Sequence, residues 1–444
     1  MQIIQPSSKT IIKILGKPKL SEKGFRWMTY VLLENVPNGV LLFHMLTREL
    51  LLLTLEEYAA ADHLPELRDK WFRVPEEMND RKYADQVRFV CKTVKKKAED
   101  ITNYTIFTTT DCNARCFYCY EMGRSRVSMS EETAHKAADY IAKHCGNEKK
   151  VRLSWFGGEP LFNKKMIDVI CRDLTEKGVE YSSDIISNGY LFDVKTVQEA
   201  VERWNLNWVQ IAMDGTEETY NRNKAFIYKD GLSPYQVVLD NIGHLLDAGV
   251  RVFVRMNMSS HNVENLFALA GKLHERFAGQ QKLTAYSHML FAFAGNREYV
   301  QSAEERRNLF YQQQRLREKL ISYEMWQPYQ LKKKLSMNMC MADSGNSLTI
   351  LPNGELGLCE HYSEDHFVGH IDSEGFDETI VRKFREQWPS IADCETCFYY
   401  PECIRLRMCE ERRECFTEMR EERRQKILEG MQEIYAAWIK NEEK

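Results

Sequence analysis

Between residues 101 and 293 the sequence alternates six short strand-like runs with helical patterns, and this alternation constrains the fold more than any other feature. Amphipathic stretches such as 130–144 and 234–249 separate successive runs. Strands joined by crossover helices form a parallel sheet. We therefore predict an α/β fold in which six strand–helix units form a partial (β/α)6 barrel. The predicted strands are residues 101–110, 151–158, 179–189, 208–215, 251–257 and 283–293.

Four of the predicted strands end in loops of unusual composition. The first loop, 111–119, holds three cysteines, and the next three contain "GGEP" (157–160), "SNGY" (187–190) and "MDGT" (213–216). In barrels of parallel strands the site residues lie on loops at the carboxyl ends of the strands. We therefore expect the functional site at this edge of the sheet.

Charge and hydropathy exclude several classes of protein. The 61 Lys and Arg nearly balance the 65 Asp and Glu among 444 residues, without the basic excess typical of nucleic-acid binding. The start "MQIIQPSSKT" lacks the pattern of a signal peptide, and no apolar run is long enough to span a membrane. We expect a cytoplasmic protein with no nucleic-acid or membrane partner. Its thirteen cysteines should then be reduced, and clustered ones should bind metal.

Three cysteines fit the packing of helices. Cys91, Cys145 and Cys171 each lie on an apolar stripe of helical spacing, which predicts a small buried side chain. The other ten cysteines have no such pattern.

Three of those ten form the loop after the first predicted strand. Cys112, Cys116 and Cys119 have the spacing C-x3-C-x2-C. Three thiolates on one loop can hold three corners of a 4Fe–4S cluster and leave the fourth iron open. A structural zinc site needs a fourth ligand, and the nearest histidines, His135 and His144, lie on the following helical stretch. The spacing alone leaves both metals open.

Two motifs together resemble the signature of the radical S-adenosylmethionine (SAM) enzymes. They are the cysteine triplet, with Tyr118 just before its last member, and "GGEP" at the end of the second strand. The resemblance implies that SAM chelates the open iron of a 4Fe–4S cluster and is cleaved to a 5′-deoxyadenosyl radical, which makes the chain an oxidoreductase.

The same resemblance implies which residues contact SAM. Gly157, Gly158 and Glu159 would hold its amino group, because glycines allow close approach and a carboxylate pairs with an ammonium. Tyr118 would lie against the adenine. Further cofactor or substrate contacts would come from Ser187, Asn188 and Arg255.

The loop around "MDGT" departs from the family. Ala212 stands where relatives often have Ser, which puts one carboxylate contact in doubt. Either Arg222 or Lys224 would take the cationic role in this loop.

Seven cysteines near the C-terminus resemble the SPASM extension of radical SAM enzymes, which carries auxiliary 4Fe–4S clusters. Cys409 departs from the family spacing, because five residues rather than three separate it from Cys403. Seven thiolates cannot fill two four-cysteine sites, so the first cluster has an open iron or takes a distant ligand. The implied sets are Cys340, Cys359 and Cys409 for one cluster and Cys394, Cys397, Cys403 and Cys415 for the other.

Glu360 follows Cys359 directly and is the candidate general base. Enzymes that mature sulfatases have an Asp beside the corresponding cysteine, and a base must be a carboxylate or imidazole near the reacting centre. A solvated surface side chain is the alternative interpretation.

The first 95 residues resemble the winged-helix peptide-recognition domain of radical SAM peptide maturases. Extended runs are predicted at 9–16, 26–36 and 71–80, and Thr54 with Glu57 predicts a capping box. Such a domain would bind a leader peptide by strand addition. The expected domains are winged-helix-like 1–95, barrel 100–305, helical linker 306–335, SPASM 336–430 and the C-terminal helix end 431–444.

We therefore hypothesise a radical SAM/SPASM maturase of a ribosomally made precursor peptide, which installs a thioether or carbon–carbon cross-link. The implied cofactors are SAM and three 4Fe–4S clusters, one SAM-binding and two auxiliary, with a reductant such as flavodoxin or ferredoxin. The alternatives are a formylglycine-forming enzyme of the sulfatase-maturase type and a non-enzymatic zinc adaptor.

Overall fold

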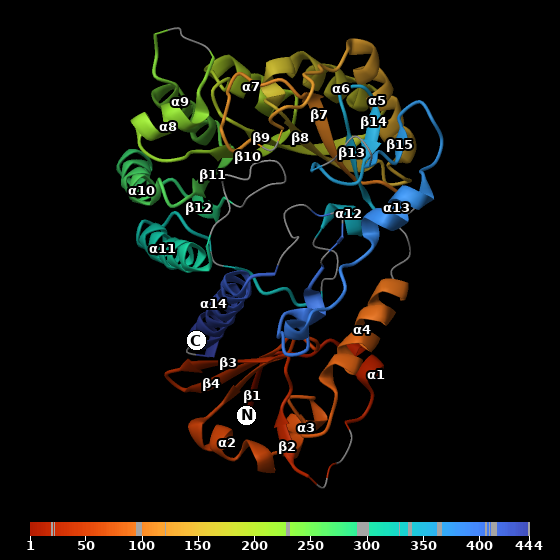
Figure 1. The fold of residues 1–444 in the computed structure, drawn as a ribbon, viewed down its shortest axis with the longest axis vertical. Helices are drawn as coiled ribbons and strands as arrows, with labels where there is room; N and C mark the ends of the chain where they lie inside the picture. Colours follow the sequence, from red (N-terminus) through yellow and green to blue (C-terminus); the bar gives the residue numbers. More distant parts are fainter. Residues whose placement is uncertain are drawn as a thin grey trace.

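A computed structural model of the 444-residue chain describes most of its residues. Figure 1 shows an N-terminal unit at one end of the molecule, a large sheet with surrounding helices at the other, and the C-terminal segments between them. The described residues are 1–18, 21, 23–94, 100–119, 121–227, 231–290, 302–327, 329–335, 340–361, 366–404, 406–407, 409 and 415–442.

Six parallel strands form the larger part of the large sheet, from the edge strand β12 to β7, and they follow the order of the sequence, as predicted. Apolar residues alternate along each strand, and those that face outward pack under the helices in one continuous core. The strands are β7 (Asn103–Thr109), β8 (Lys150–Gly157), β9 (Glu180–Ser187), β10 (Leu206–Ala212), β11 (Arg251–Met258) and β12 (Leu283–Met289), and the helices are α5 (Glu131–His144), α6 (Lys164–Glu176), α7 (Val194–Glu202), α8 (Glu217–Lys224), α9 (Pro234–Asp247) and α10 (Val263–Phe277).

Three C-terminal strands extend this sheet beyond β7. β13 (Ser347–Ile350) pairs in parallel with β7, and β14 (Glu355–Gly357) and β15 (Gly369–His370) follow in antiparallel pairing. This pairing has no local signal in the sequence, because β7 and β13 are more than 200 residues apart in the chain and the three C-terminal strands are short.

The N-terminal unit is built on a four-stranded antiparallel sheet in the order β1-β5-β4-β3. Apolar side chains cover both of its faces, so helices pack on each. The capping box of Thr54 and Glu57 is present at the start of α2. The elements are β1 (Gln2–Gln5), α1 (Lys9–Leu15), β2 (Phe25–Trp27), β3 (Val31–Val36), β4 (Gly39–His44), β5 (Leu50–Leu53), α2 (Leu55–Ala59), α3 (Pro65–Asp69), β6 (Arg73–Pro75) and α4 (Asp80–Val94).

One predicted strand of this unit is wrong. Residues 9–16 form the helix α1, whose buried Ile11 and Leu15 have the i, i+4 spacing of a helix face, and Gly16 ends it with a positive φ of 74°. The predicted strand 26–36 is also interrupted at residues 28–30, between β2 and β3.

Two long helices connect the parts. α11 (Ala303–Ser322) lies against β12, and α14 (Thr417–Glu442) packs Ile427 and Met431 into the core of the N-terminal unit. α12 (Met341–Ser344) and α13 (Glu378–Arg385) lie between them in sequence.

The three cysteines expected in helix packing are where their patterns predicted. Cys145 and Cys171 are buried in the core of the large sheet, and Cys91 is half-buried against the core of the N-terminal unit.

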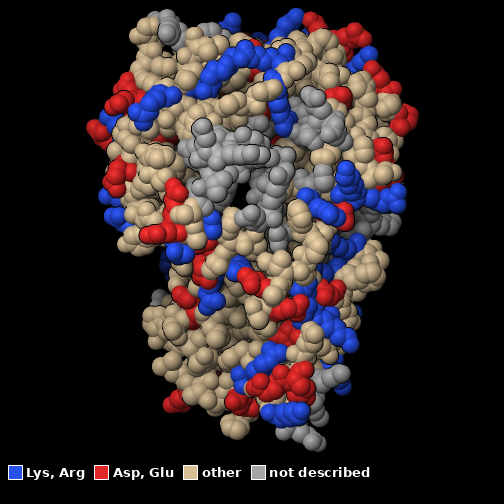
Figure 2. Space-filling view, viewed as in Figure 1, with Lys and Arg blue, Asp and Glu red and all other residues tan. Residues whose placement is uncertain are grey.

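Charges of both signs intermingle over most of the face that Figure 2 shows. A largely uncharged area lies at its lower left, where Figure 1 places β3 and β4. In the described part of the chain, every helix is too short or too polar to cross a membrane.

Candidate functional site

Cys112, Cys116 and Cys119 lie together on the loop that follows β7. Desolvation by the surrounding protein, together with the nearby Glu159 and the other two thiols, raises the pKa of the Cys112 thiol to about 12. Desolvation, together with the nearby Glu121 and Cys116, raises the pKa of Cys119 to about 11, although this side chain reaches the surface. Burial also raises the pKa of Cys116. Because thiols with raised pKa values lose their protons only beside positive charge, this loop suits a metal group that supplies that charge.

The "GGEP" loop packs against the backbone of the thiol loop. A Cβ on Gly158 would lie 2.3 Å from the carbonyl oxygen of Asp111, and one on Gly157 would lie 2.2 Å from that of Thr109. The φ of Gly157 is 124°, which side chains rarely adopt. Only glycine fits at these two positions, so the second motif holds the first loop in place.

Glu159 joins the ends of β8 and β9. Its side chain is fully buried and accepts hydrogen bonds from Ser187 Oγ (2.8 Å), the Asn188 backbone N–H (2.8 Å) and the Leu161 backbone N–H (3.2 Å). Burial raises its pKa to about 7 against these hydrogen bonds, which lower it. The carboxylate therefore already binds three donors of its own chain, and its predicted contact with an ammonium stays a prediction.

Asn188 reaches from the end of β9 to the thiol loop. Its Nδ2 donates to Asn113 Oδ1 at 2.6 Å and lies 3.7 Å from Cys112 Sγ. The structure thus brings four of the predicted site residues together: Cys112, Glu159, Ser187 and Asn188.

Tyr118 belongs to a buried polar network. Its hydroxyl donates to Asp214 Oδ2 at 2.5 Å and accepts from Lys224 Nζ at 2.6 Å and Asn257 Nδ2 at 3.2 Å. Lys224 also pairs with Asp214 at 3.4 Å, and both side chains are at most 3% exposed. Arg222, in contrast, is 64% exposed beside Glu218. Lys224 is therefore the cation that faces this site.

Burial lowers the pKa of Lys224, but the Asp214 carboxylate and the Cys116 thiol outweigh it and raise the pKa overall. The ammonium is thus charged beside the thiol loop. The positive charge of Lys224 favours the thiolate form of Cys116. The ion pair between Lys224 and Asp214 offsets the cost of burying both charges.

Arg255 lies on β11 between Ala212 of β10 and Tyr286 of β12. Its Nη2 is 3.2 Å from His288 Nδ1, and its buried Nε has no hydrogen-bond partner among the residues that the structure describes. Beside it, Tyr286 donates to Gln210 at 2.5 Å. These side chains form a polar cluster on three neighbouring strands, β10, β11 and β12.

The first C-terminal set of thiols also converges. Burial and the neighbouring Glu360 raise the pKa of Cys359, and Cys340 and Cys409 raise it further. Glu360 Oε2 lies 3.8 Å from Cys359 Sγ. The candidate base is therefore beside a predicted cluster ligand and is partly accessible.

In the second C-terminal set, burial raises the pKa of Cys397, and Cys403 and Cys415 raise it further. The Cys397 N–H donates to the carbonyl of Cys394 at 3.4 Å. The four cysteines expected to share a cluster thus lie in one region.

Sequence reasoning missed Glu121, two residues after Cys119. It is only 8% exposed, and burial raises its pKa to about 7, while the charges of Arg124 and His361 lower it. His361 follows Glu360, so Glu121 lies between the thiol loop and the first C-terminal set. Only its position after the triplet could have drawn attention to it.

The thiol groups offer the donor chemistry of iron–sulfur clusters. Within the described ranges, no three His, Cys, Asp or Glu side chains are arranged to hold one metal ion. Several iron atoms lie between the thiolates of a 4Fe–4S cluster, so these stand further apart than the ligands of one zinc ion. The donor set is also the soft thiolate set of iron–sulfur clusters.

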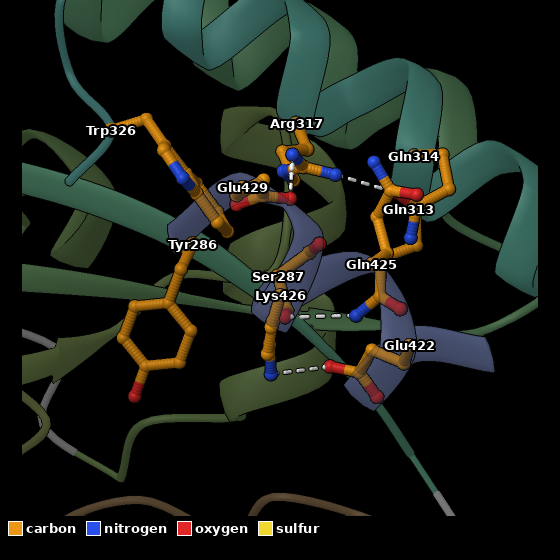
Figure 3. A pocket seen from close by; sticks show the side chains of 10 residues that line it. All are labelled: Tyr286, Ser287, Gln313, Gln314, Arg317, Trp326, Glu422, Gln425, Lys426 and Glu429. Carbon is orange, nitrogen blue, oxygen red and sulfur yellow. Dashed lines mark hydrogen bonds and ion pairs between the residues drawn. The ribbon is translucent and has the colours of Figure 1, made fainter. Parts of the chain in front are cut away.

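A separate cavity lies between β12, α11 and α14 (Figure 3). Its polar lining includes the ion pair of Arg317 with Glu429 and the buried Gln313, which donates to the Ser287 carbonyl at 3.0 Å. A volume of about 50 Å³ holds about four water molecules and is too small for SAM. We assign it no ligand.

Residues 106–269 match the model of the Radical SAM superfamily. The chain contains a radical SAM domain. The match spans the thiol loop, "GGEP" and the network around Asp214. Residues 106–269 are therefore an enzyme domain that uses SAM.

The curated relatives match only part of the chain. A probable GTP 3′,8-cyclase of Pyrococcus abyssi is 29% identical over 184 residues, which are 39% of this chain and 54% of that protein. One of Archaeoglobus fulgidus is 37% identical over 70 residues, which are 16% of this chain and 23% of that protein. The chain thus spans about half or less of the relatives' length.

Solved structures resemble the chain more completely. anSMEcpe with bound AdoMet has a TM-score of 0.56 at 15% identity and covers 76% of this chain and 96% of its own. Streptococcus suis SuiB bound to S-adenosylmethionine has a TM-score of 0.53 at 12% identity and covers 87% and 94%. SuiB bound to precursor peptide SuiA has a TM-score of 0.52 at 11% identity and covers 86% and 94%. At these identities the likeness establishes the fold.

Proposed function

We propose that this protein is a radical SAM peptide maturase that acts in the cytoplasm and cross-links a ribosomally made precursor peptide. The observation that carries the proposal is the convergence of the thiol loop with Gly158, Glu159 and Asn188 at the ends of three strands. When bound, SAM and its cluster supply a radical that abstracts hydrogen from carbon. The chain holds and orients the cofactor and the peptide and excludes water.

The residues of the site divide this work. Cys112, Cys116 and Cys119 would hold the SAM-binding cluster. Gly157 and Gly158 would let SAM approach the backbone, while Glu159 and Ser187 hold Asn188 beside Cys112. Lys224 supports the charge of the thiol loop. Tyr118 and Arg255 would border the cofactor and the substrate.

The two C-terminal thiol sets would hold auxiliary clusters that accept the electron left when the cross-link forms. Glu360 would take up the proton that is released with it, because its carboxylate lies beside Cys359 and is partly accessible. Flavodoxin or ferredoxin would supply the electron that starts each cycle.

A leader peptide would add as a strand to β3. This strand is at one edge of the four-stranded sheet, and Figure 2 shows few charges over the face near it. Strand addition uses the backbone groups of such an edge, while side chains give selectivity. Fold likeness to SuiB bound to precursor peptide SuiA and to anSMEcpe bound to Cp18Cys peptide supports a peptide substrate.

GTP cyclisation is a second candidate, because the curated relatives are probable GTP 3′,8-cyclases. Their similarity covers at most 39% of this chain, which leaves the N-terminal unit without a role. Formylglycine formation is a third candidate, and Glu360 beside Cys359 is the feature that would serve it.

The first test measures iron, acid-labile sulfide and zinc after anaerobic reconstitution, in the parent and in a Cys112/Cys116/Cys119→Ala variant. We expect about twelve irons per chain in the parent and about eight in the variant, with loss of SAM cleavage. Zinc without iron would contradict the proposal.

The second test separates the candidate substrates. Reconstituted enzyme, SAM and reductant are incubated with GTP or with short peptides encoded beside its gene. Loss of two hydrogen atoms from a peptide that gains no aldehyde, seen by mass spectrometry, supports cross-linking, whereas a new aldehyde supports formylglycine formation and a cyclised nucleotide supports the second candidate. Glu360→Gln should lower peptide turnover about 100-fold or more and leave SAM cleavage unchanged.

A further inference from the structure

The N-terminal unit holds the loop that carries two of the predicted ligands of the second auxiliary cluster. Arg88 of α4 donates from Nη1 to the carbonyl oxygens of Tyr400 (2.6 Å) and Cys403 (2.9 Å) and, more weakly, of Pro401 (3.4 Å). The Arg88 residue is only 7% exposed. One guanidinium thus fixes the backbone of a loop more than 300 residues away in the sequence.

Further contacts join the same two segments, which lie side by side in Figure 1. The ring of Tyr400 lies between the guanidinium groups of Arg81 and Arg88, at 3.3 Å and 4.7 Å from its centre, and its hydroxyl bonds to Asp85. In addition, Arg48 and Glu402 form an ion pair at 3.2 Å, with both side chains at most 2% exposed.

The thiols themselves share the core of the N-terminal unit. Cys397 and Cys403 pack against the cluster of side chains that also contains Val87 of α4 and Met431 of α14. The loop therefore takes its shape from contacts with the other end of the chain rather than from its own short turns.

The charge of Arg88 is not used by a carboxylate. Its hydrogen bonds go to carbonyl oxygens and to the Gln387 side chain at 3.3 Å, and in the described part of the chain it forms no ion pair. A buried cation without an acidic partner is costly unless an anionic group lies nearby. Four thiolates around an iron–sulfur cluster are such a group.

We propose that Arg88 is a positioning residue for the second auxiliary cluster, and that its charge stabilises the reduced state of that cluster. The inference rests on the proposed function, because it requires a cluster at Cys394, Cys397, Cys403 and Cys415. Hydrogen bonds and nearby charge are among the factors that set the potential of an iron–sulfur cluster, and reduction adds negative charge, which a buried cation favours.

The test compares Arg88→Met and Arg88→Lys with the parent after reconstitution. Iron and sulfide are counted, and the potential of each cluster is measured by redox titration followed by electron paramagnetic resonance. Arg88→Met should lose about four irons of about twelve, or keep them with a lowered potential for one cluster. Arg88→Lys keeps the charge but not the several hydrogen bonds that the guanidinium donates. Its iron content and cluster potential should therefore lie between those of the parent and those of Arg88→Met.

Two further variants make the result specific. Cys397→Ala removes a ligand of the second site directly. If Arg88→Met loses iron, the amount lost should equal the amount that Cys397→Ala loses. A variant with both substitutions should lose no more iron than Cys397→Ala alone. Arg317→Met removes a half-buried arginine of α11 that contacts Glu429 and should keep all the iron.

Parent-like iron and potentials in Arg88→Met would overturn the inference, as would equal iron loss in Arg317→Met. If Arg88→Met does not fold, Arg88→Lys decides instead. Parent-like iron content and parent-like cluster potentials in Arg88→Lys would then overturn the inference. A parent with only about four irons contradicts the auxiliary clusters of the proposed function and ends the inference with them. An intact parent with an unaffected Arg88→Met ends the inference alone.

Discussion

The two best-defined thiol regions of this protein are built in opposite ways. Cys112, Cys116 and Cys119 lie within eight residues on one loop, and neighbouring strand ends hold that loop through two glycines and Asn188. Cys394, Cys397 and Cys403 lie on short turns between residues 392 and 403, which Arg88 and Arg48 of the N-terminal unit hold through Cys403 and Glu402. The first site forms wherever the barrel folds, whereas the second requires the two ends of the chain to meet.

Single cysteine variants test whether the two thiol regions are independent of each other. Of the predicted changes, their effects on SAM cleavage and iron content should be the largest. Cys116→Ala should abolish SAM cleavage and lower the iron by about four, because one iron corner loses its ligand. Cys397→Ala should lose as much iron but retain SAM cleavage under strong reductant. Loss of SAM cleavage in both variants would show that the first region depends on the second.

Lys224→Met tests how far the first region depends on α8. Removing one partner of a buried ion pair leaves Asp214 charged and unpaired, so we expect a loss of about 3–5 kcal/mol in the free energy of unfolding. The control is Arg222→Met on the same helix, where an exposed pair contributes about 0.5 kcal/mol or less. Denaturant unfolding of the two variants under anaerobic conditions measures the difference, and equal losses would contradict the assignment.

Glu159 gives the stability of the first region a dependence on pH. Its folded pKa of about 7 is above the ordinary value of 4.5, so the fold favours the protonated acid. Its contribution to stability is complete below pH 4.5 and is lost as the pH rises through 7, by about 3 kcal/mol. Glu159→Gln should remove this decline.

The measurement compares the unfolding free energy of cluster-free parent and Glu159→Gln at about pH 4 and pH 8, on either side of the folded pKa. Relative to the parent, the variant should gain stability with rising pH. Parallel pH profiles for the two proteins would show that this carboxylate does not titrate in that range.

The smallest predicted effect concerns the general stability of the N-terminal unit. It tests whether the second thiol region depends on that stability or on the contact with Arg88. Thr54→Ala removes the capping box of α2 and should cost about 1 kcal/mol, measured by thermal unfolding. Because Thr54 is remote in sequence from α4, the iron content should be unchanged. Iron loss here would mean that any weakening of the unit disrupts the second region, and the role of Arg88 would need revision.

Much of the barrel was predictable because its signals are local. Alternating apolar residues and amphipathic stretches identified the six parallel strands and their order, and the placement of Cys112, "GGEP" and Asn188 at strand ends brought them to one edge of the sheet. The run 9–16 misled the prediction, since its closely spaced isoleucines favour a strand, while tertiary packing selected the helix face of Ile11 and Leu15.

By itself the sequence determined the parallel sheet and the edge at which the cysteine loop, "GGEP" and Asn188 meet, because periodicity and spacing act over a few residues. Only the tertiary structure decided that Lys224 rather than Arg222 faces the first thiols, that Glu159 is already bonded, and that β13 extends the sheet beside β7. It also placed Arg88 against Cys403. Such contacts join residues that are far apart in the chain. They depend on which side chains become buried together, and short sequence patterns do not predict this.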